Sequence, residues 1–293
     1  MIMETNSPVC ITDIEIHGMW GNTNVIWHNV QPDINIVVGQ NGFGKSTILN
    51  ILRNVLQKNE KELRALKVTA HILTSAGMMD FDGKNISQKP AYGGFPGQNS
   101  FQYVNTFDVP ASKKSTLSQL GLTLDAVLYQ RSDDVYSFSD YRLGMLKDLS
   151  TAVQKQQRIN ALFEMIDGLF EGTGKKISID DKQRIVFLKP NPGNKRNGGN
   201  DIIPIERLSA GEKQILVLLF TLFLMENKPT VLLLDEPEIS LHIEWQDKLL
   251  GLFRQLNPNC QIILTTHSPN IFADGWSDNL VFISDLIRQD SSD

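Results

Sequence analysis

The sequence predicts a mixed α/β fold, in which a sheet flanked by helices is interrupted along the chain by an inserted subdomain. Short and mostly apolar runs, typical of buried strands, occur near both ends of the chain, at residues 34–38, 231–234 and 262–265. Segments with apolar residues at helical spacing accompany these runs. The middle of the chain instead combines a long helical pattern with a hairpin pattern, which indicates an insertion within one core.

The amino-terminal part begins with a predicted β-hairpin. Residues 9–17 alternate apolar and polar side chains, residues 24–28 repeat the alternation, and the turn-like segment 18–22 lies between them. Two edge strands would have the same pattern. The apolar run 34–38 predicts a buried strand, and a helix starts at Thr47 after a glycine-rich loop.

The middle of the chain predicts loops, helices and a second hairpin. Residues 83–100 resemble a loop because Pro and Gly recur in them, and residues 101–107 predict a strand that returns to the core. The remaining predictions are helices over 117–130 and 138–170, a hairpin over 175–189 and a polar loop over 190–201.

The carboxy-terminal part predicts helices that alternate with buried strands. The helices cover residues 211–226 and 241–256, and the strands cover 231–234 and 262–265. We therefore expect residues 1–110 and 207–293 to form the two parts of one core, with residues 111–206 as the inserted helical and hairpin subdomain.

Composition and charge limit the classes of function. The 293 residues are 41% hydrophobic and 21% charged, which excludes a globally disordered chain. The net charge of −5 argues against a generally basic nucleic-acid coat but is compatible with a local basic groove. Cys10 and Cys260 lack metal-binding spacing and fit a reducing compartment. The amino terminus does not resemble a signal peptide and the apolar stretch 215–225 is too short to span a bilayer, so we expect a cytoplasmic protein without membrane insertion.

A glycine-rich loop between the predicted strand 34–38 and the next helix has the pattern GxxxxGK[ST]. The loop consists of Gly39, Gln40, Asn41, Gly42, Phe43, Gly44, Lys45, Ser46 and Thr47. Backbone N–H groups of such a loop bind phosphate, Lys45 is suited to the β- and γ-phosphates, and Ser46 is suited to ligate Mg²⁺. The structural alternative, a plain glycine-rich turn, is disfavoured by the strand before the loop and the helix after it.

Two adjacent carboxylates end the buried strand 231–234. In a nucleotide site, Asp235 would hold the Mg²⁺ shell and Glu236 would polarise the attacking water as general base. The alternative is an acidic strand cap without a chemical role.

Two further motifs carry groups that suit a phosphate site. Ser209 and Gly211 begin a predicted helix and expose backbone N–H groups, although Ser209 with Glu212 also matches an ordinary capping box. His267 follows the last buried strand, where it can reach a γ-phosphate or serve as a structural histidine.

Together the four motifs resemble those of ABC-type ATPases. The loop 39–47, LSAGEKQ (208–214), LLLDEPE (232–238) and TTHSP (265–269) are similar to the Walker A, signature, Walker B and switch-histidine motifs. The stretch DEPEISLHIEWQ (235–246) resembles the ATPase domains of the OLD family and, more broadly, RecF- and SMC-like ATPases. Transporter ATPases more usually carry LSGGQ and DEPT-like versions.

The resemblance implies an enzyme that binds ATP and Mg²⁺ and hydrolyses ATP, with Lys45, Glu236 and His267 as catalytic residues. It also implies a nucleotide-gated head-to-tail homodimer, with each ATP between Gly39–Thr47 of one subunit and Ser209–Gly211 of the other. The family's D-loop falls at Ser240 and His242, which would cross the dimer seam, although His242 equally fits a surface residue that caps the next helix.

Two parts of the expected site leave alternatives open. Asp108 would be the Mg²⁺ ligand that couples the site to the insertion, but it equally suits a turn before a Val-Pro pair. The aromatic group that stacks on adenine would be Trp20, Trp27 or His28, each of which fits packing of the hairpin on the core as well.

The resemblance also bears on the biological role. The chain ends soon after His267, without room for the Toprim nuclease of OLD proteins, and no long coiled coil separates its halves. We therefore expect a stand-alone ATPase head that acts with a separate effector protein, as switch or sensor in DNA repair or anti-phage defence. The alternatives are the ATPase subunit of an ABC transporter and a non-hydrolysing scaffold. Nucleic acid would contact basic residues that equally form a solvated charged face, namely Lys155, Arg158, Lys189, Lys195 and Arg196.

Overall fold

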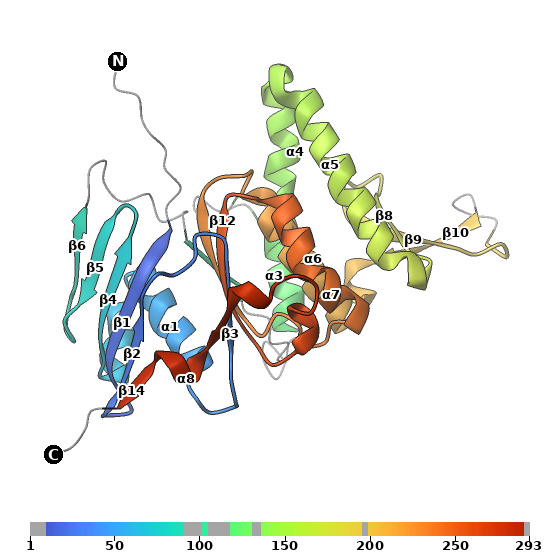
Figure 1. The fold of residues 1–293 in the computed structure, drawn as a ribbon. Helices are drawn as coiled ribbons and strands as arrows, with labels where there is room; N and C mark the ends of the chain where they lie inside the picture. Colours follow the sequence, from blue (N-terminus) through green and yellow to red (C-terminus); the bar gives the residue numbers. More distant parts are fainter. Residues whose placement is uncertain (1–9, 91–100, 105–117, 131–135, 195–198, 290–293) are drawn as a thin grey trace. The chain divides into compact units, whose positions relative to one another are not determined.

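The computed structural model describes residues 10–90, 101–104, 118–130, 136–194 and 199–289 (Figure 1). The chain divides into two compact units. Unit 1 comprises Met1–Thr106, Asn227–Glu238 and Gln246–Asp293, and unit 2 comprises Phe107–Glu226 and Ile239–Trp245. Segments that are distant in the sequence therefore share one unit.

Unit 1 contains a six-stranded antiparallel sheet with the order β14-β2-β1-β4-β5-β6. Its strands are β1 (Ile11–Met19), β2 (Thr23–Trp27), β4 (Thr69–Thr74), β5 (Gly77–Phe81), β6 (Ile86–Pro90) and β14 (Ile287–Gln289). The predicted hairpin is confirmed, because β1 and β2 pair with Ile14 opposite Trp27. The prediction of a loop over 83–100 is wrong at residues 86–90, which form the edge strand β6. Pro90 is tolerated there because it is the last residue of an edge strand.

The second sheet of unit 1 is parallel, has five strands and has the order β13-β3-β12-β11-β7. Its strands are β3 (Ile34–Val38), β7 (Phe101–Val104), β11 (Thr230–Asp235), β12 (Cys260–Thr266) and β13 (Leu280–Phe282). This sheet confirms the predicted mixed α/β class. Because its strands are parallel, the carboxyl ends of β3, β11 and β12 meet at one edge, where ligands bind in open α/β sheets.

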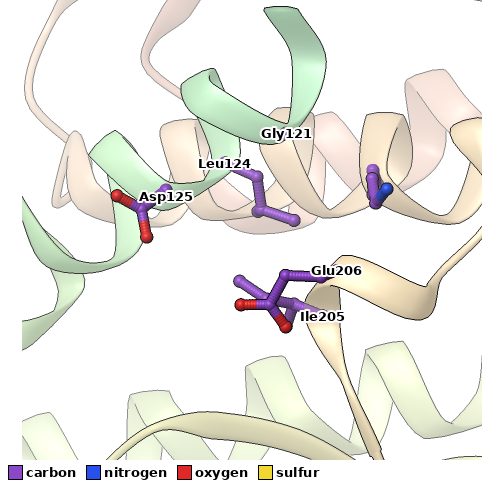
Figure 2. A pocket seen from close by; sticks show the side chains of 6 residues that line it. Gly121, Leu124, Asp125, Ile205 and Glu206 are labelled. Carbon is purple, nitrogen blue, oxygen red and sulfur yellow. The ribbon is translucent and has the colours of Figure 1, made fainter. Parts of the chain in front are cut away.

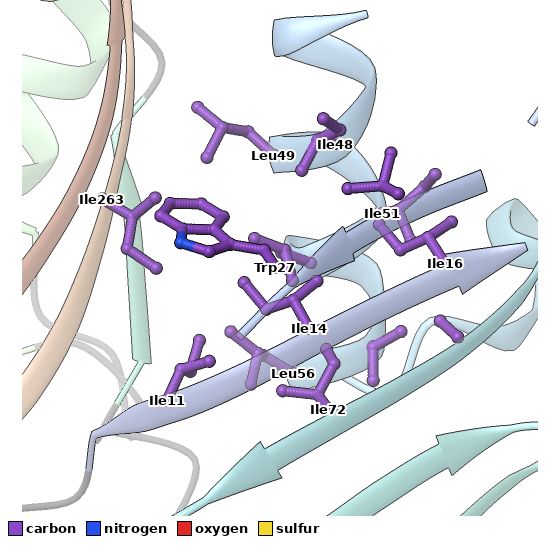
Figure 3. Close-up of a cluster of buried hydrophobic side chains, with 14 of the residues drawn as sticks. Ile11, Ile14, Ile16, Trp27, Ile48, Leu49, Ile51, Leu56, Ile72 and Ile263 are labelled. Atoms are coloured by element: carbon purple, nitrogen blue, oxygen red, sulfur yellow. The ribbon is translucent and has the colours of Figure 1, made fainter. Parts of the chain in front are cut away.

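The core of unit 1 is built around α1 (Lys45–Leu56). Its apolar face (Ile48, Leu49, Ile51, Leu52 and Val55) is buried together with side chains from both sheets, among them Ile14, Ile16, Ile72 and Ile263 (Figure 3). Each such side chain stabilises the fold by about 1.5–3 kcal/mol. The other helices that contribute residues to unit 1 are α2 (Glu60–Leu66), α7 (Ile243–Leu256, from Gln246 onward) and α8 (Ile283–Leu286).

Unit 2 combines helices with a three-stranded antiparallel sheet of order β10-β9-β8. The helices are α3 (Gln119–Tyr129), α4 (Phe138–Lys147), α5 (Leu149–Phe170) and α6 (Ala210–Leu224), and the strands are β8 (Lys176–Ile179), β9 (Ile185–Pro190) and β10 (Asn200–Pro204). The predicted hairpin over 175–189 is confirmed. The loop predicted over 190–201 gives way at Asn200 to β10.

The helix predicted over 138–170 is two helices. Asp148 has an extended backbone that ends α4, and its carboxylate accepts a hydrogen bond from the Ser150 backbone N–H at 3.1 Å. An aspartate in this position is a good N-cap, so a second helix starts where the first stops. Within the described residues, no helix is both long and apolar enough to cross a bilayer.

Candidate functional site

The loop Gly39–Thr47 joins β3 to α1 at the carboxyl edge of the parallel sheet of unit 1. Gly39, Gly42 and Gly44 have positive φ angles of 153°, 84° and 94°. A Cβ atom at Gly44 would lie 2.4 Å from Cη2 of Trp20, and one at Gly39 would lie 2.3 Å from Cγ2 of Ile283. Backbone conformation and close packing therefore both require glycine at these two positions.

Lys45, in the first turn of α1, folds back over this loop and is only 5% exposed. Its Nζ donates hydrogen bonds to the carbonyl oxygens of Gly39 (2.9 Å) and Gln40 (3.2 Å), and it lies 2.7 Å from Nε2 of His267. Burial lowers the pKa of Lys45, and the carboxylates of Glu236, Asp235 and Glu238 oppose this shift. The ammonium group of Lys45 is thus close to three carboxylates, next to the glycine-rich loop.

Asp235 ends β11 and is 5% exposed. Its Oδ1 accepts hydrogen bonds from Oγ of Ser46 (3.0 Å) and Oγ1 of Thr265 (2.5 Å). A hydroxyl and a carboxylate side by side are the oxygen ligands that Mg²⁺ takes when substrate phosphates complete its shell. The described residues include no group of three or more His, Cys, Asp or Glu side chains that could hold a metal unaided.

Glu236 follows directly and adopts a left-handed backbone conformation with φ of 48°. Its backbone N–H donates to the Thr265 carbonyl at 3.1 Å, and its Oε1 lies 3.2 Å from Nε2 of His267. Burial raises the pKa of Glu236, while His267 lowers it. A left-handed non-glycine residue costs about 1–3 kcal/mol and is typical of functional sites.

Glu238 is a site residue that the motif analysis missed. It is 7% exposed, and its Oε1 accepts hydrogen bonds from the segment Thr266–Ser268 that carries His267. The only sequence signal was its place in the acidic run after β11. That run does not reveal burial, because the partners lie about 30 residues further along the chain.

The three candidates for an adenine-stacking group differ in environment. Trp27 is 4% exposed and belongs to the core of unit 1 (Figure 3). His28 follows the end of β2, with Nδ1 3.1 Å from Oδ1 of Asp13. Trp20 is 58% exposed in the turn after β1 and lies against Gly44. Trp20 alone combines exposure with contact to the loop.

The signature-like motif belongs to unit 2 and begins α6. Oγ of Ser209 accepts from the Glu212 N–H at 3.2 Å, and Oε2 of Glu212 accepts from the Ser209 N–H at 2.9 Å, so the capping box is present. Oε1 of Glu212 also pairs with Nζ of Lys175 at 2.6 Å. A Cβ atom on Gly211 would lie 2.2 Å from the Ser240 carbonyl oxygen.

This contact joins the signature-like and D-loop-like segments within unit 2. Ser240 has a left-handed backbone conformation with φ of 69°. The side chain of His242 is exposed, and its carbonyl oxygen accepts from the Trp245 N–H at 2.9 Å at the start of α7. That arrangement fits the alternative in which His242 caps the next helix.

A small cavity in unit 2 lies beside the start of α6 (Figure 2). It is lined by Gly121, Leu124, Asp125, Ile205, Glu206 and Lys213. Its volume of about 20 Å³ has room for a water molecule but not for a nucleotide.

The remaining candidates are an expected Mg²⁺ ligand and several basic residues. Asp108, Lys195 and Arg196 lie outside the described residues. Arg158 donates from Nη2 to the Phe223 carbonyl at 3.1 Å and lies over the Phe223 ring, so it serves packing of α5 on α6.

Comparisons with known proteins identify the family of the chain. A family model described as "AAA domain, putative AbiEii toxin, Type IV TA system" matches residues 123–274, just over half of the chain. The Septu protein PtuA of Bacillus thuringiensis is 23% identical over 304 residues, which cover 89% of this chain and 72% of that protein. A retron Vc95 probable ATPase of Vibrio cholerae serotype O1 biovar El Tor is 30% identical over 102 residues, which cover 31% of this chain and 20% of that protein.

The fold also resembles a solved structure. An SMC head, solved bound to the C-winged helix domain of ScpA, aligns with a TM-score of 0.53, 15% identity and 93% coverage of both chains. At this identity the likeness concerns the fold alone.

Proposed function

Because the chain belongs to the AAA-domain family described as putative AbiEii toxin of the type IV TA system and is an ATPase, we propose that it binds and hydrolyses ATP at the edge formed by Gly39–Thr47, Asp235, Glu236 and His267. The observation that carries this proposal is the convergence of side chains from three motifs. Ser46 bonds to Asp235 at 3.0 Å, and Lys45 lies 2.7 Å from His267. These groups have the chemistry that phosphoryl transfer requires.

Each residue of the site has its own proposed chemical role. Lys45 and the free N–H groups at the start of α1 bind phosphate oxygens, and Ser46 and Asp235 hold Mg²⁺. Mg²⁺ supplies the positive charge that neutralises the phosphates. Glu236, whose pKa is raised by burial, accepts the proton of the attacking water, and His267 contacts the γ-phosphate. Positioning and charge neutralisation then account for the rate increase.

Trp20 is the group that we propose to stack on adenine. The phosphates occupy the loop, and the indole of Trp20 lies against Gly44 at the end of that loop nearest α1. The ring is exposed, so a base can cover it without displacing core side chains.

ATP-dependent dimerisation is the second part of the proposal. Phe43 in the loop and Phe282 at the end of β13 are large apolar side chains that are exposed near the site. Ser209 is exposed at the start of α6. A second copy that places Ser209–Gly211 over Gly39–Thr47 would cover apolar surface and present helix N–H groups to the γ-phosphate.

We further propose that the chain is the cytoplasmic switch or sensor subunit of an anti-phage defence or DNA repair system. The similarity to a Septu protein and to a retron ATPase supports the defence role. In this role, residues 111–206 engage a separate effector protein, and ATP hydrolysis resets the switch.

The proposal is tested by steady-state ATP hydrolysis of the purified protein with Mg²⁺, with and without duplex DNA. Wild type is expected to release phosphate, and Lys45→Ala is expected to abolish release. Stimulation by DNA supports a nucleic-acid sensor, and indifference to DNA points to a protein trigger. Copurification with an integral membrane protein would instead favour the ATPase subunit of a transporter.

A further inference from the structure

We propose that Glu238 is a positioning residue that holds His267 in place for ATP hydrolysis. The inference deepens the proposed function and rests on it. Glu238 follows the Asp235-Glu236 pair by two residues but has a different environment, because its carboxylate is turned into the protein and is 7% exposed. Glu238 and all the residues that it contacts here belong to unit 1.

The Oε1 atom of Glu238 accepts three hydrogen bonds from one short segment at the end of β12. It accepts from Oγ1 of Thr266 at 2.6 Å, from the His267 N–H at 3.0 Å and from the Ser268 N–H at 3.3 Å. These are consecutive residues, and the central one carries the imidazole. Bonds from a carboxylate to backbone N–H groups are about twice as strong as neutral ones, so this carboxylate fixes the backbone of His267.

Gln246, the first residue of α7 that belongs to unit 1, contacts both Ser268 and Glu238. Its Oε1 accepts from Oγ of Ser268 at 2.6 Å, and its Nε2 donates to the Glu238 carbonyl at 3.5 Å. The segment Thr266–Ser268 is therefore held from two sides, by the Glu238 carboxylate and by the Gln246 amide.

Fixing the backbone of His267 also determines where its imidazole ring lies. With its backbone fixed, His267 places Nε2 3.2 Å from Oε1 of Glu236 and 2.7 Å from Nζ of Lys45. The Glu238 carboxylate also acts electrostatically on Lys45 and Glu236. Its hydrogen bonds, however, go to the Thr266–Ser268 segment, so we assign its role to the position of His267. Misplacement of a catalytic group by about 1 Å costs on the order of 10²-fold in rate.

The second oxygen of Glu238 distinguishes this role from simple fold stabilisation. Among the described residues, Oε2 is one of few buried side-chain polar atoms without a hydrogen-bond partner. A buried acceptor without a partner is unfavourable, so the carboxylate is not optimised for stability. Its geometry is explained by the contacts that Oε1 makes to the His267 segment.

The test compares Glu238→Ala, Glu238→Gln, Thr266→Val and His267→Ala, with the double variant Glu238→Ala/His267→Ala. For each variant, kcat and KM for MgATP and the Kd of a non-hydrolysable ATP analogue are measured.

Glu238→Ala is expected to lower kcat by about 10²-fold while KM and Kd change by less than about threefold, because the buried carboxylate bonds to Thr266–Ser268 and not to the phosphate-binding loop. Glu238→Gln keeps the Oε1 acceptor and is expected to recover kcat to within about tenfold of wild type. Exposed Glu62→Ala is the matched control.

The double variant gives the sharpest readout. If Glu238 acts through His267, the double variant has the kcat of His267→Ala alone. A further loss on that background, or a wild-type kcat in both Glu238→Ala and Thr266→Val, overturns the inference. Should Glu238→Ala fail to fold, Thr266→Val decides, with an expected loss of about fivefold in kcat from one missing donor. If His267→Ala itself hydrolyses ATP like wild type, the proposed function has failed instead.

Discussion

Oγ of Ser46 donates a hydrogen bond to Oδ1 of Asp235 across 3.0 Å, which joins the start of α1 to the end of β11 over a sequence separation of 189 residues. The contact depends on the parallel sheet, because β3 and β11 both pair with β12 and end at the same edge. Thr265 on β12 bonds to the same carboxylate oxygen. The oxygen ligands proposed for Mg²⁺ are thus brought together by the fold itself.

Lys45→Ala is predicted to weaken ATP binding. Nζ of Lys45 makes bonds to Gly39 and Gln40 that phosphate oxygens would replace. A hydrogen bond to a charged group contributes about 1.5–3 kcal/mol, so the Kd for ATP should rise by about 10- to 100-fold. Calorimetric titration measures this, with exposed Lys61→Ala as control. Equal affinities of Lys45→Ala and wild type would contradict the placement of the phosphates.

Trp20→Ala is predicted to separate binding of the base from binding of the phosphates. Stacking of a base on an aromatic side chain contributes about 1–3 kcal/mol, and Trp20→Phe should retain part of it. The affinity for ATP should therefore fall while the affinity for inorganic tripolyphosphate stays the same. An equal loss for both ligands would show that Trp20 supports the loop rather than the adenine.

Two glycines in helices are predicted to respond in opposite ways to alanine. A Cβ atom at Gly211 meets the Ser240 carbonyl at 2.2 Å, whereas one at Gly251 in α7 meets nothing within 4 Å. Gly251→Ala should raise the free energy of unfolding by about 0.5–1 kcal/mol through helix propensity. Gly211→Ala should lower it, because backbone must move. Chemical denaturation measures both, and a gain in Gly211→Ala would refute the close approach of Ser240.

The ion pair between Lys175 and Glu212 is predicted to be sensitive to the loss of one partner. Its side chains are 16% and 7% exposed, and the two atoms lie 2.6 Å apart. Lys175→Met leaves the Glu212 carboxylate buried and should lower the free energy of unfolding by about 3 kcal/mol. Addition of Glu212→Gln, which keeps an acceptor for the Ser209 N–H, should restore most of the loss. Equal stability of Lys175→Met and wild type would exclude a buried pair.

Parts of the fold with strong local patterns could be predicted from the sequence. Residues 231–234 are apolar throughout and residues 34–38 are apolar except for Asn35, as expected for strands covered on both faces. The loop Gly39–Thr47 was predictable because its chemistry imposes a fixed spacing. These patterns were sufficient to predict that the loop and the acidic pair follow strands of one core.

Other features depend on partners that the local sequence does not reveal. Ile287–Gln289 is short and becomes a strand because β2 offers a free edge. Glu238 resembles an exposed acidic residue and is buried because Thr266–Ser268 supplies its donors. The choice of Trp20 over Trp27 required knowledge of which ring the core covers.

Glu236 is the general base proposed for ATP hydrolysis at this site, and Glu236→Gln is the variant that removes this role with the least change of shape. The amide keeps the shape of the side chain but cannot accept the proton of the attacking water. Steady-state phosphate release and the Kd for MgATP are measured on wild type and on Glu236→Gln. We predict that the variant binds ATP as wild type does, hydrolyses it at least about 10²-fold more slowly and accumulates as an ATP-bound dimer. Unaltered turnover in Glu236→Gln would show that Glu236 is not the general base.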